Sequence, residues 1–153
     1  MAWRKPTVSD LAARLSQAEL DSYRKSPDAA GGGDPVEALL DGVAAMVRMA
    51  CRTNGRVRLS PRGGEIPESL MGAAMDWAAF DVLKRLPTTV GMTEARKTAR
   101  DEAKETFRRV SEGSLLPEPY AEGGVEATDA GRPMPSFSAG RADVLGEPWG
   151  RRG

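Results

Sequence analysis

Histidine is entirely missing from this chain of 153 residues. Its absence excludes Ser-His-Asp and Cys-His catalysis, histidine-ligated metal centres and proton transfer through an imidazole. Cysteine occurs once, at Cys51, so the chain can form neither an internal disulfide nor a cysteine-rich zinc site. A lone cysteine on an apolar helical stripe is more typical of a packed side chain than of a nucleophile. We therefore expect no enzyme, no cofactor and no metal site.

A long hydrophobic run and an excess of charge of either sign are missing as well. No window approaches the roughly 18 apolar residues of a membrane span, and residues 1–11 hold no apolar stretch of a secretory signal. The 22 basic side chains balance 22 acidic ones, so no overall charge attracts nucleic acid or anionic lipid. These features predict a soluble protein, made in the cytosol, with no membrane partner.

Proline and glycine divide the chain into two unlike parts. Residues 114–153 contain five prolines and seven glycines but few large apolar side chains. Such a segment has too little apolar surface to offset the entropy of ordering it alone. We therefore predict a helical core domain of residues 1–113, followed by a Pro/Gly-rich extended arm of residues 114–153.

Single apolar side chains are scattered along this arm. That spacing is typical of an extended chain that lays side chains into pockets on another surface, although a low-complexity terminus without a partner would look similar. A neighbouring chain is the partner that we expect to hold the arm. The candidate partner-binding residues are Leu115, Leu116, Tyr120, Phe137, Leu145 and Trp149.

The first 113 residues predict an all-α fold, a small bundle of about four helices. Ser16 and Glu19 form a capping-box pattern, and Asp34 with Pro35 is a strong helix start. Thr7 or Ser9 is the N-cap of a first short helix, and Gly113 ends the last. The expected helical stretches are residues 7–23, 34–52, 67–86 and 93–113.

The stretch of residues 67–86 is apolar on more than one side, which is typical of a helix in the middle of a bundle or under a partner chain. Before it, residues 56–59 alternate polar and apolar side chains, which predicts a short strand or an extended segment.

Basic side chains gather in two places. Four arginines within eleven residues, with no acid among them, suit contact with phosphate or with an acidic protein, but also describe a hydrated loop. A second set recurs every four residues along the last helix, beside acids that favour surface ion pairs over an acidic partner. The candidate channel or acidic-partner contacts are therefore Arg52, Arg56, Arg58, Arg62, Arg96, Arg100, Lys104 and Arg108.

The order of these pieces resembles a known family. A T-x-S-D-L-A-A-R-L pattern at residues 7–15 leads to Glu19 and Leu20, a long helix and an arginine-rich loop. A helix that starts at Ile66 and Pro67 follows, and then one that ends in Ser-Glu-Gly-Ser-Leu-Leu-Pro at residues 111–117. This order is similar to that of the small head–tail connector (adaptor) proteins of Mu-like tailed phages and prophages. Phe137-Ser138, Arg141 and Leu145-Gly146 also resemble the F-S-R-x-x-L-x-G ending common in that group.

The resemblance implies a structural virion protein at the head–tail interface, assembled in the host cytoplasm. Such adaptors are all-helical and form a ring, expected to be a dodecamer, beneath the portal. The ring extends the DNA channel and links capsid to tail. The implied partners are other copies of the chain, the portal protein, a tail-side connector or stopper protein, and passing double-stranded DNA without sequence specificity. The alternative is a small helical DNA-binding or DNA-packaging accessory protein that uses the two basic sets.

Overall fold

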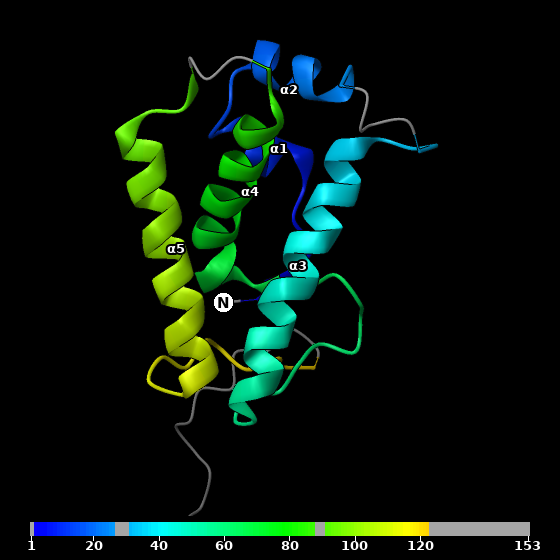
Figure 1. The fold of residues 1–153 in the computed structure, drawn as a ribbon. Coiled ribbons are helices and arrows are strands. Elements are labelled where there is room, and N and C mark those ends of the chain that lie inside the picture. The colour runs from blue at the N-terminus through cyan, green and yellow to red at the C-terminus, as the bar shows by residue number, and fades with distance from the viewer. Residues whose placement is uncertain (1, 27–30, 88–90, 123–153) are drawn as a thin grey trace, which may run out of the picture.

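The fold is all-α, with one very small sheet. The computed structural model describes residues 2–26, 31–87 and 91–122. Figure 1 shows α4 between α3 and α5, with α2 across one end of the bundle. In chain order the elements are β1 (Trp3–Arg4), α1 (Val8–Ala12), α2 (Gln17–Arg24), α3 (Pro35–Asn54), β2 (Ile66–Pro67), the 3-10 helix η2 (Glu68–Leu70), α4 (Met71–Arg85) and α5 (Glu94–Glu112).

The two short N-terminal helices begin at capping boxes. Thr7, rather than Ser9, caps α1, and its side chain accepts from the backbone N–H of Asp10 while the Asp10 carboxylate accepts from the backbone N–H of Thr7. Ser16 and Glu19 make the same reciprocal pair at the start of α2, as the sequence predicts. Each box satisfies two backbone donors that a helix start would otherwise leave without a partner.

Helix α3 starts as predicted and is longer than expected. The Asp34 carboxylate accepts from the backbone N–H of Val36 at 3.0 Å, and Pro35 occupies the first helical position. The helix continues through Asn54 and ends at Gly55, whose φ of 74° is the left-handed conformation that favours glycine. The helix therefore extends two residues beyond the expected end at residue 52.

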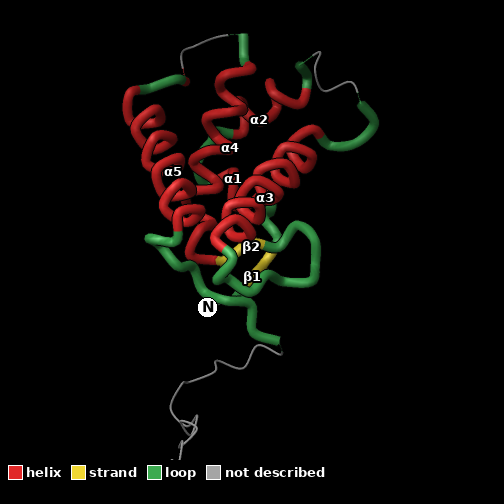
Figure 2. Tube along the Cα trace, turned by 60° about the horizontal axis from the view of Figure 1, so that its bottom comes forward, coloured by secondary structure: helices red, strands yellow, loops and turns green. Residues whose placement is uncertain are grey.

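The strand lies elsewhere than the polar–apolar alternation suggests. Residues 56–59 form no strand; instead β2 pairs antiparallel with β1, with Trp3 opposite Pro67 and Arg4 opposite Ile66. Figure 2 shows this two-stranded sheet at the end of the bundle where α3 finishes. Because β2 takes up Pro67, helical structure begins at Glu68 as η2 and continues as α4.

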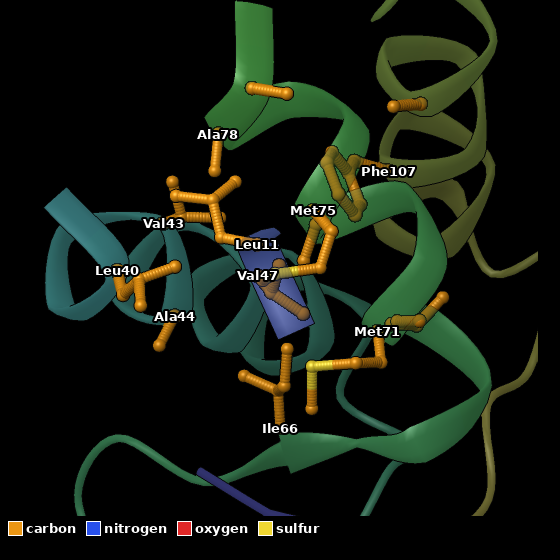
Figure 3. Packing of buried hydrophobic residues seen from close by; sticks show 14 of the residues in the cluster. Leu11, Leu40, Val43, Ala44, Val47, Ile66, Met71, Met75, Ala78 and Phe107 are labelled. Carbon is orange, nitrogen blue, oxygen red and sulfur yellow. The ribbon is translucent and has the colours of Figure 1, made fainter. Parts of the chain in front are cut away.

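Helix α4 occupies the centre of the bundle, as its all-round apolar pattern predicts. Its buried side chains meet those of α1, α3 and α5. Figure 3 shows this packing, with Met71, Met75 and Ala78 of α4 among side chains of the other elements, which include Leu11, Val43, Val47 and Phe107. Helix α5 begins after its N-cap, Thr93, the first residue of the expected stretch 93–113, and ends at Gly113, with φ of 82°. It buries a narrow stripe made of Ala103, Phe107 and Val110.

The packed unit does not stop at Gly113. Residues 114–122 turn back under the bundle, where Pro117 is buried and Leu115 and Tyr120 pack against the core. We call residues 114–122 the strap. The rest of the predicted arm, residues 123–153, lies outside the described residues.

Candidate interaction surfaces

The four arginines nearest the end of α3 lie on the surface, in what we call the arginine segment (residues 52–62). Arg52 lies in the last turn of α3, and Arg56, Arg58 and Arg62 lie in the loop that follows the turn at Gly55. The side chains of Arg58 and Arg62 are 67% and 78% exposed. Of the four arginines, only these two have an acidic partner within 4 Å in the described part of the chain: Arg58 has Glu122 at 3.6 Å and Arg62 has Glu65 at 3.5 Å. Exposed pairs of this kind contribute about 0–1 kcal/mol, so the guanidinium groups stay available.

A shallow groove of about 540 Å³ borders the arginine segment. Lys5 and Arg52 line it together with Met49, whose side chain is 67% exposed. Asp41 is also on its wall, at 3.0 Å from the Lys5 ammonium. Arg52 therefore gives this surface a basic character, Asp41 neutralises Lys5, and Met49 adds one exposed apolar side chain.

Arg48 holds the loop that carries these arginines. Its guanidinium donates to the carbonyl oxygens of Ser60 and Glu65, at 2.8 Å each, and lies 5.9 Å from the centroid of the Trp3 ring. Ser60 is buried, and its hydroxyl donates to the Glu65 carboxylate and accepts from the backbone N–H of Arg62. Buried polar groups need such partners, so this network gives the loop a defined shape without regular secondary structure.

The strap is tied to the bundle at three points. The Trp3 indole N–H donates to the carbonyl of Glu118 at 2.9 Å, and the Trp3 and Tyr120 rings meet edge to face at 6.4 Å. The Glu118 carboxylate accepts from the backbone N–H of Ser69 at 2.9 Å, so a residue of the strap caps the start of η2. The backbone N–H of Tyr120 donates to the carbonyl of Arg58 at 2.8 Å. The strap thus begins the arm at a fixed place beside the arginine segment.

The electrostatics of Glu118 follow from this position. Burial acts to raise its pKa, but hydrogen bonds from the Ser69 side chain and from the backbone around it outweigh burial and hold the pKa below its usual range. The carboxylate is therefore charged at neutral pH, which strengthens its bond to the helix start.

The predicted arm residues fall into three groups. Leu115 and Tyr120 contact the core of their own chain, whereas Leu116 is 57% exposed beside them. Phe137, Leu145 and Trp149 lie outside the described residues. Sequence reasoning missed Trp3 and Arg48, the side chains that hold the strap and the loop; the one signal for Trp3 was a tryptophan in a chain poor in aromatics.

The way α5 faces the bundle divides the second basic set, which we call the basic ridge: Arg96, Arg100, Lys104 and Arg108. Arg96 turns inward and donates to the Glu19 carboxylate at 2.9 Å, to the Gly91 carbonyl at 2.6 Å and to the Arg14 carbonyl at 3.2 Å. This guanidinium therefore joins α5 to α2 and to Arg14, in the link between α1 and α2.

Arg100 also faces the bundle. Its guanidinium carbon lies 4.6 Å from the centroid of the Trp77 ring and 5.0 Å from that of Phe80, so it covers two aromatic side chains of α4. Lys104 is exposed, and Arg108 is paired with Glu105 and Glu112 on the same helix. Only the second half of the ridge is a solvated surface.

A second groove, of about 530 Å³, runs along α3 and α4; we call it the α3–α4 groove. Helix α3 contributes apolar side chains, among them Leu39 and Met46, and α4 contributes Trp77. Charged groups lie toward the end near α2, where the Arg85 guanidinium donates to the Tyr23 hydroxyl at 3.1 Å. The full lining is Tyr23, Gly31, Pro35, Ala38, Leu39, Gly42, Val43, Met46, Trp77, Asp81 and Arg85.

Cys51 is fully buried in the core, and burial raises the pKa of its thiol to about 11. The thiolate is the reactive form, so this cysteine is inert at neutral pH. Within residues 2–26, 31–87 and 91–122, no cluster of three or more potential ligands is placed to hold a metal ion. In the same part of the chain, no helix is both long enough and apolar enough to span a bilayer.

No protein-family model, no curated protein and no solved structure matches this chain. What it does must therefore be inferred from its own residues and from the three surfaces described above: the arginine segment, the strap from which the arm starts, and the α3–α4 groove.

Proposed function

We propose that this protein is a structural virion component without enzymatic activity, a head–tail connector that forms a ring beneath the portal of a tailed phage. The sequence supports this proposal through the order of its elements over residues 7–117, which resembles the order in Mu-like adaptors. In this role the chain joins neighbouring copies, the portal and a tail-side protein, and double-stranded DNA passes through the ring.

The observation that carries the proposal is the attachment of the strap. A connector must transmit force between capsid and tail, so an arm that reaches a partner has to start from a firm point on the bundle. Trp3, Ser69 and Arg58 supply that point through hydrogen bonds to residues 118 and 120. The arm starts beside the arginine segment, while the α3–α4 groove includes Pro35 and Arg85 near the opposite end of the bundle, so two unlike surfaces lie at different places on the molecule. Unlike surfaces that meet head to tail can close into a ring.

The distribution of charge on α5 suits a channel wall. Arg108 is neutralised by two acids of its own helix, and Lys97 pairs with Glu94 at 2.7 Å. A surface with paired charges lets duplex DNA pass, whereas a continuous positive surface would retain its phosphates.

Quantitative mass spectrometry of purified phage particles, made by cells that encode this chain, tests the proposal. We expect the chain in the particles at a ratio to the portal protein of about one to one. Abundance in the lysate together with absence from the particles would refute the connector role.

A matched pair of chains tests the arm. A chain that ends at Glu122 keeps the strap, and we expect it to fold yet fail to join particles, whereas the full chain joins them. If the shortened chain assembles as the full chain does, the arm has no part in attachment.

The exposed arginine segment favours a second function, that of a DNA-binding accessory protein. Its four guanidinium groups and Lys5 lie near one end of the molecule with few acids beside them. Replacing Arg52, Arg56, Arg58 and Arg62 by glutamine should then weaken duplex binding and lower its salt slope by about 3–4.

The control for that experiment carries the same change in net charge on α5, by replacing Lys97, Lys104, Arg108 and Arg109 with glutamine. A duplex affinity that falls equally in both variants would show a nonspecific charge effect. No binding of the wild-type chain at low salt would eliminate the DNA-binding function.

A further inference from the structure

The α3–α4 groove is an apolar surface that the described chain leaves uncovered. Leu39, Met46 and Trp77 are all half-buried along it, although each could pack fully under another segment. The rest of the core is closed: the side chains of Leu11, Val36, Val47 and Val82 are wholly inaccessible. The groove is therefore a local feature of one face, rather than the sign of a loosely packed bundle.

Gly42 lies within this groove, in the middle of α3. Glycine is a poor helix former, and none of the described residues lies within 4 Å of the position that a Cβ would occupy there. Packing among the described residues therefore does not require a glycine. A second segment that lies close over α3 would require one, because any side chain at residue 42 would fill the groove.

The end of the arm has the chemistry that fits this groove. Trp149 offers one large aromatic side chain, in a segment where Leu145 is the other large apolar residue. The groove carries the charged side chains of Asp81 and Arg85, and the segment carries Glu147 on one side of Trp149 and Arg151 and Arg152 on the other. An aromatic side chain with an acid before it and basic side chains after it matches an apolar groove that has a charge of each sign on one wall.

The arm is also long enough to reach beyond its own bundle. From Glu122 to Trp149 the chain can extend by up to roughly 90 Å, at about 3.3 Å per residue. Helix α3, the longest element, is only about 30 Å long. The arm starts at the end of the bundle where β1 and β2 lie, and the groove reaches the other end at Pro35 and Arg85 (Figures 1 and 2).

We propose that the α3–α4 groove binds residues 145–152 of a second copy of this chain, with Trp149 against Met46, Gly42 and Trp77. Each copy then gives an arm to one neighbour and receives an arm from another, through two different surfaces. The choice of a second copy rests on the ring of the proposed function, but the contact between groove and arm does not.

A peptide of residues 142–153 with a fluorescent label tests the contact. The receptor is the full chain with Trp149→Ala, so that its own arm does not compete. We expect saturable binding by anisotropy, weakened at least tenfold when the receptor also carries Gly42→Gln or when the peptide carries Trp149→Ala. Ala45→Gln, on the other flank of α3, is the control and should leave the affinity unchanged. No binding, or equal binding to the Gly42→Gln receptor, overturns the proposal.

Mixing two full-length variants tests whether the arm crosses between copies. A Gly42→Gln chain keeps its arm but loses the groove, and a Trp149→Ala chain keeps the groove but loses its arm. Sedimentation velocity should show monomers for each variant alone and dimers for the mixture, because only the mixture has one working pair. If the peptide binds but the mixture stays monomeric, the arm docks on its own groove and a second copy is not the occupant.

These outcomes are separate from those that concern the virion. If the chain is present in particles but the peptide does not bind, the connector role stands and the groove contact is refuted. If the chain is absent from particles but the peptide binds, the connector role is refuted and self-association through the groove stands.

Discussion

At the scale of single residues, Trp3 connects more of the molecule than any sequence pattern indicates. It is 7% exposed, pairs with Pro67 across the sheet, bonds to the strap and lies beside the guanidinium of Arg48. One side chain thus supports the sheet, the arginine loop and the start of the arm. A substitution here should affect all three.

We expect Trp3→Ala to lower the free energy of unfolding by about 3–5 kcal/mol, the range for removal of a large buried aromatic. Trp3→Phe keeps much of the packing but loses the bond to the Glu118 carbonyl, so its loss should be smaller. Urea denaturation measures both, with Leu116→Ala as the exposed control that should stay within about 0.5 kcal/mol of wild type. A Trp3→Ala chain as stable as wild type would show that Trp3 does not hold these parts together.

Two cations of α5 that lie one turn apart, Arg100 and Lys104, differ in their surroundings. Arg100 covers Trp77 and Phe80, whereas Lys104, one turn later, is exposed. Arg100→Ala should therefore cost about 1–2 kcal/mol of unfolding free energy, through lost packing and lost cation–π contact, and Lys104→Ala almost none. Thermal unfolding of the two variants side by side is the measurement. Equal effects would contradict the division of the ridge.

At the scale of elements, the helix starts depend on carboxylates that must be charged. The Arg4 guanidinium, which bonds to both oxygens of Asp10 at 2.8 and 2.9 Å, holds the pKa of that carboxyl well below its usual range. The Arg96 guanidinium does the same for the pKa of Glu19, and the bond from the backbone N–H of Ser16 adds to it. Both carboxylates thus stabilise the folded state only while they are ionised.

The sign of the pH dependence follows. Because the folded pKa of each group is lower than its unfolded value of about 4, the stabilisation is complete above about pH 5 and is lost as pH falls. We expect the unfolding free energy to drop between about pH 5 and 3, and to drop less in the Asp10→Asn and Glu19→Gln variants. Urea titrations across that pH range measure the slope. Slopes equal to that of wild type would show that these carboxylates do not govern acid stability.

The strap is an element in its own right, although it has no regular secondary structure. A chain that ends at Gly113 loses buried Pro117, the Tyr120 ring and the bonds to Trp3 and Ser69. We expect it to lose about 2–4 kcal/mol of stability and to exchange the amide protons of residues 56–65 faster. A chain that ends at Glu122 is the control and should match the full chain in both respects. No difference between the two truncations would mean that the strap contributes nothing to the fold.

At the scale of the whole molecule, local signals predicted much of the fold. The capping residues Ser16, Asp34 and Thr93 mark true helix starts, and Gly113 marks a true end. Their hydrogen bonds join residues two or three positions apart, so neighbours in sequence carry the whole interaction. The central place of α4 was predictable for a similar reason, since its apolar side chains surround the helix.

The candidate surfaces were predictable only in part. The arginine segment is exposed, as four arginines close in sequence without acids among them suggest. The ridge of α5 has a regular four-residue spacing in the sequence, but its two halves face different environments. Which half turns inward depends on Glu19 and Trp77, which come from two other helices. No spacing within residues 96–108 contains that information.

The sequence by itself determined most of the helix-capping residues, which faces are apolar, and that no histidine chemistry is available to this protein. Only the tertiary structure decided that Trp3 meets Glu118 across 115 positions of chain, that the strap closes one end of the bundle, and that the described residues leave the α3–α4 groove uncovered. The physical reason is the distance in sequence between the residues that interact. Caps and amphipathic periods are satisfied within one or two helical turns, whereas a strap, an inward arginine and a groove exist only once distant elements have packed.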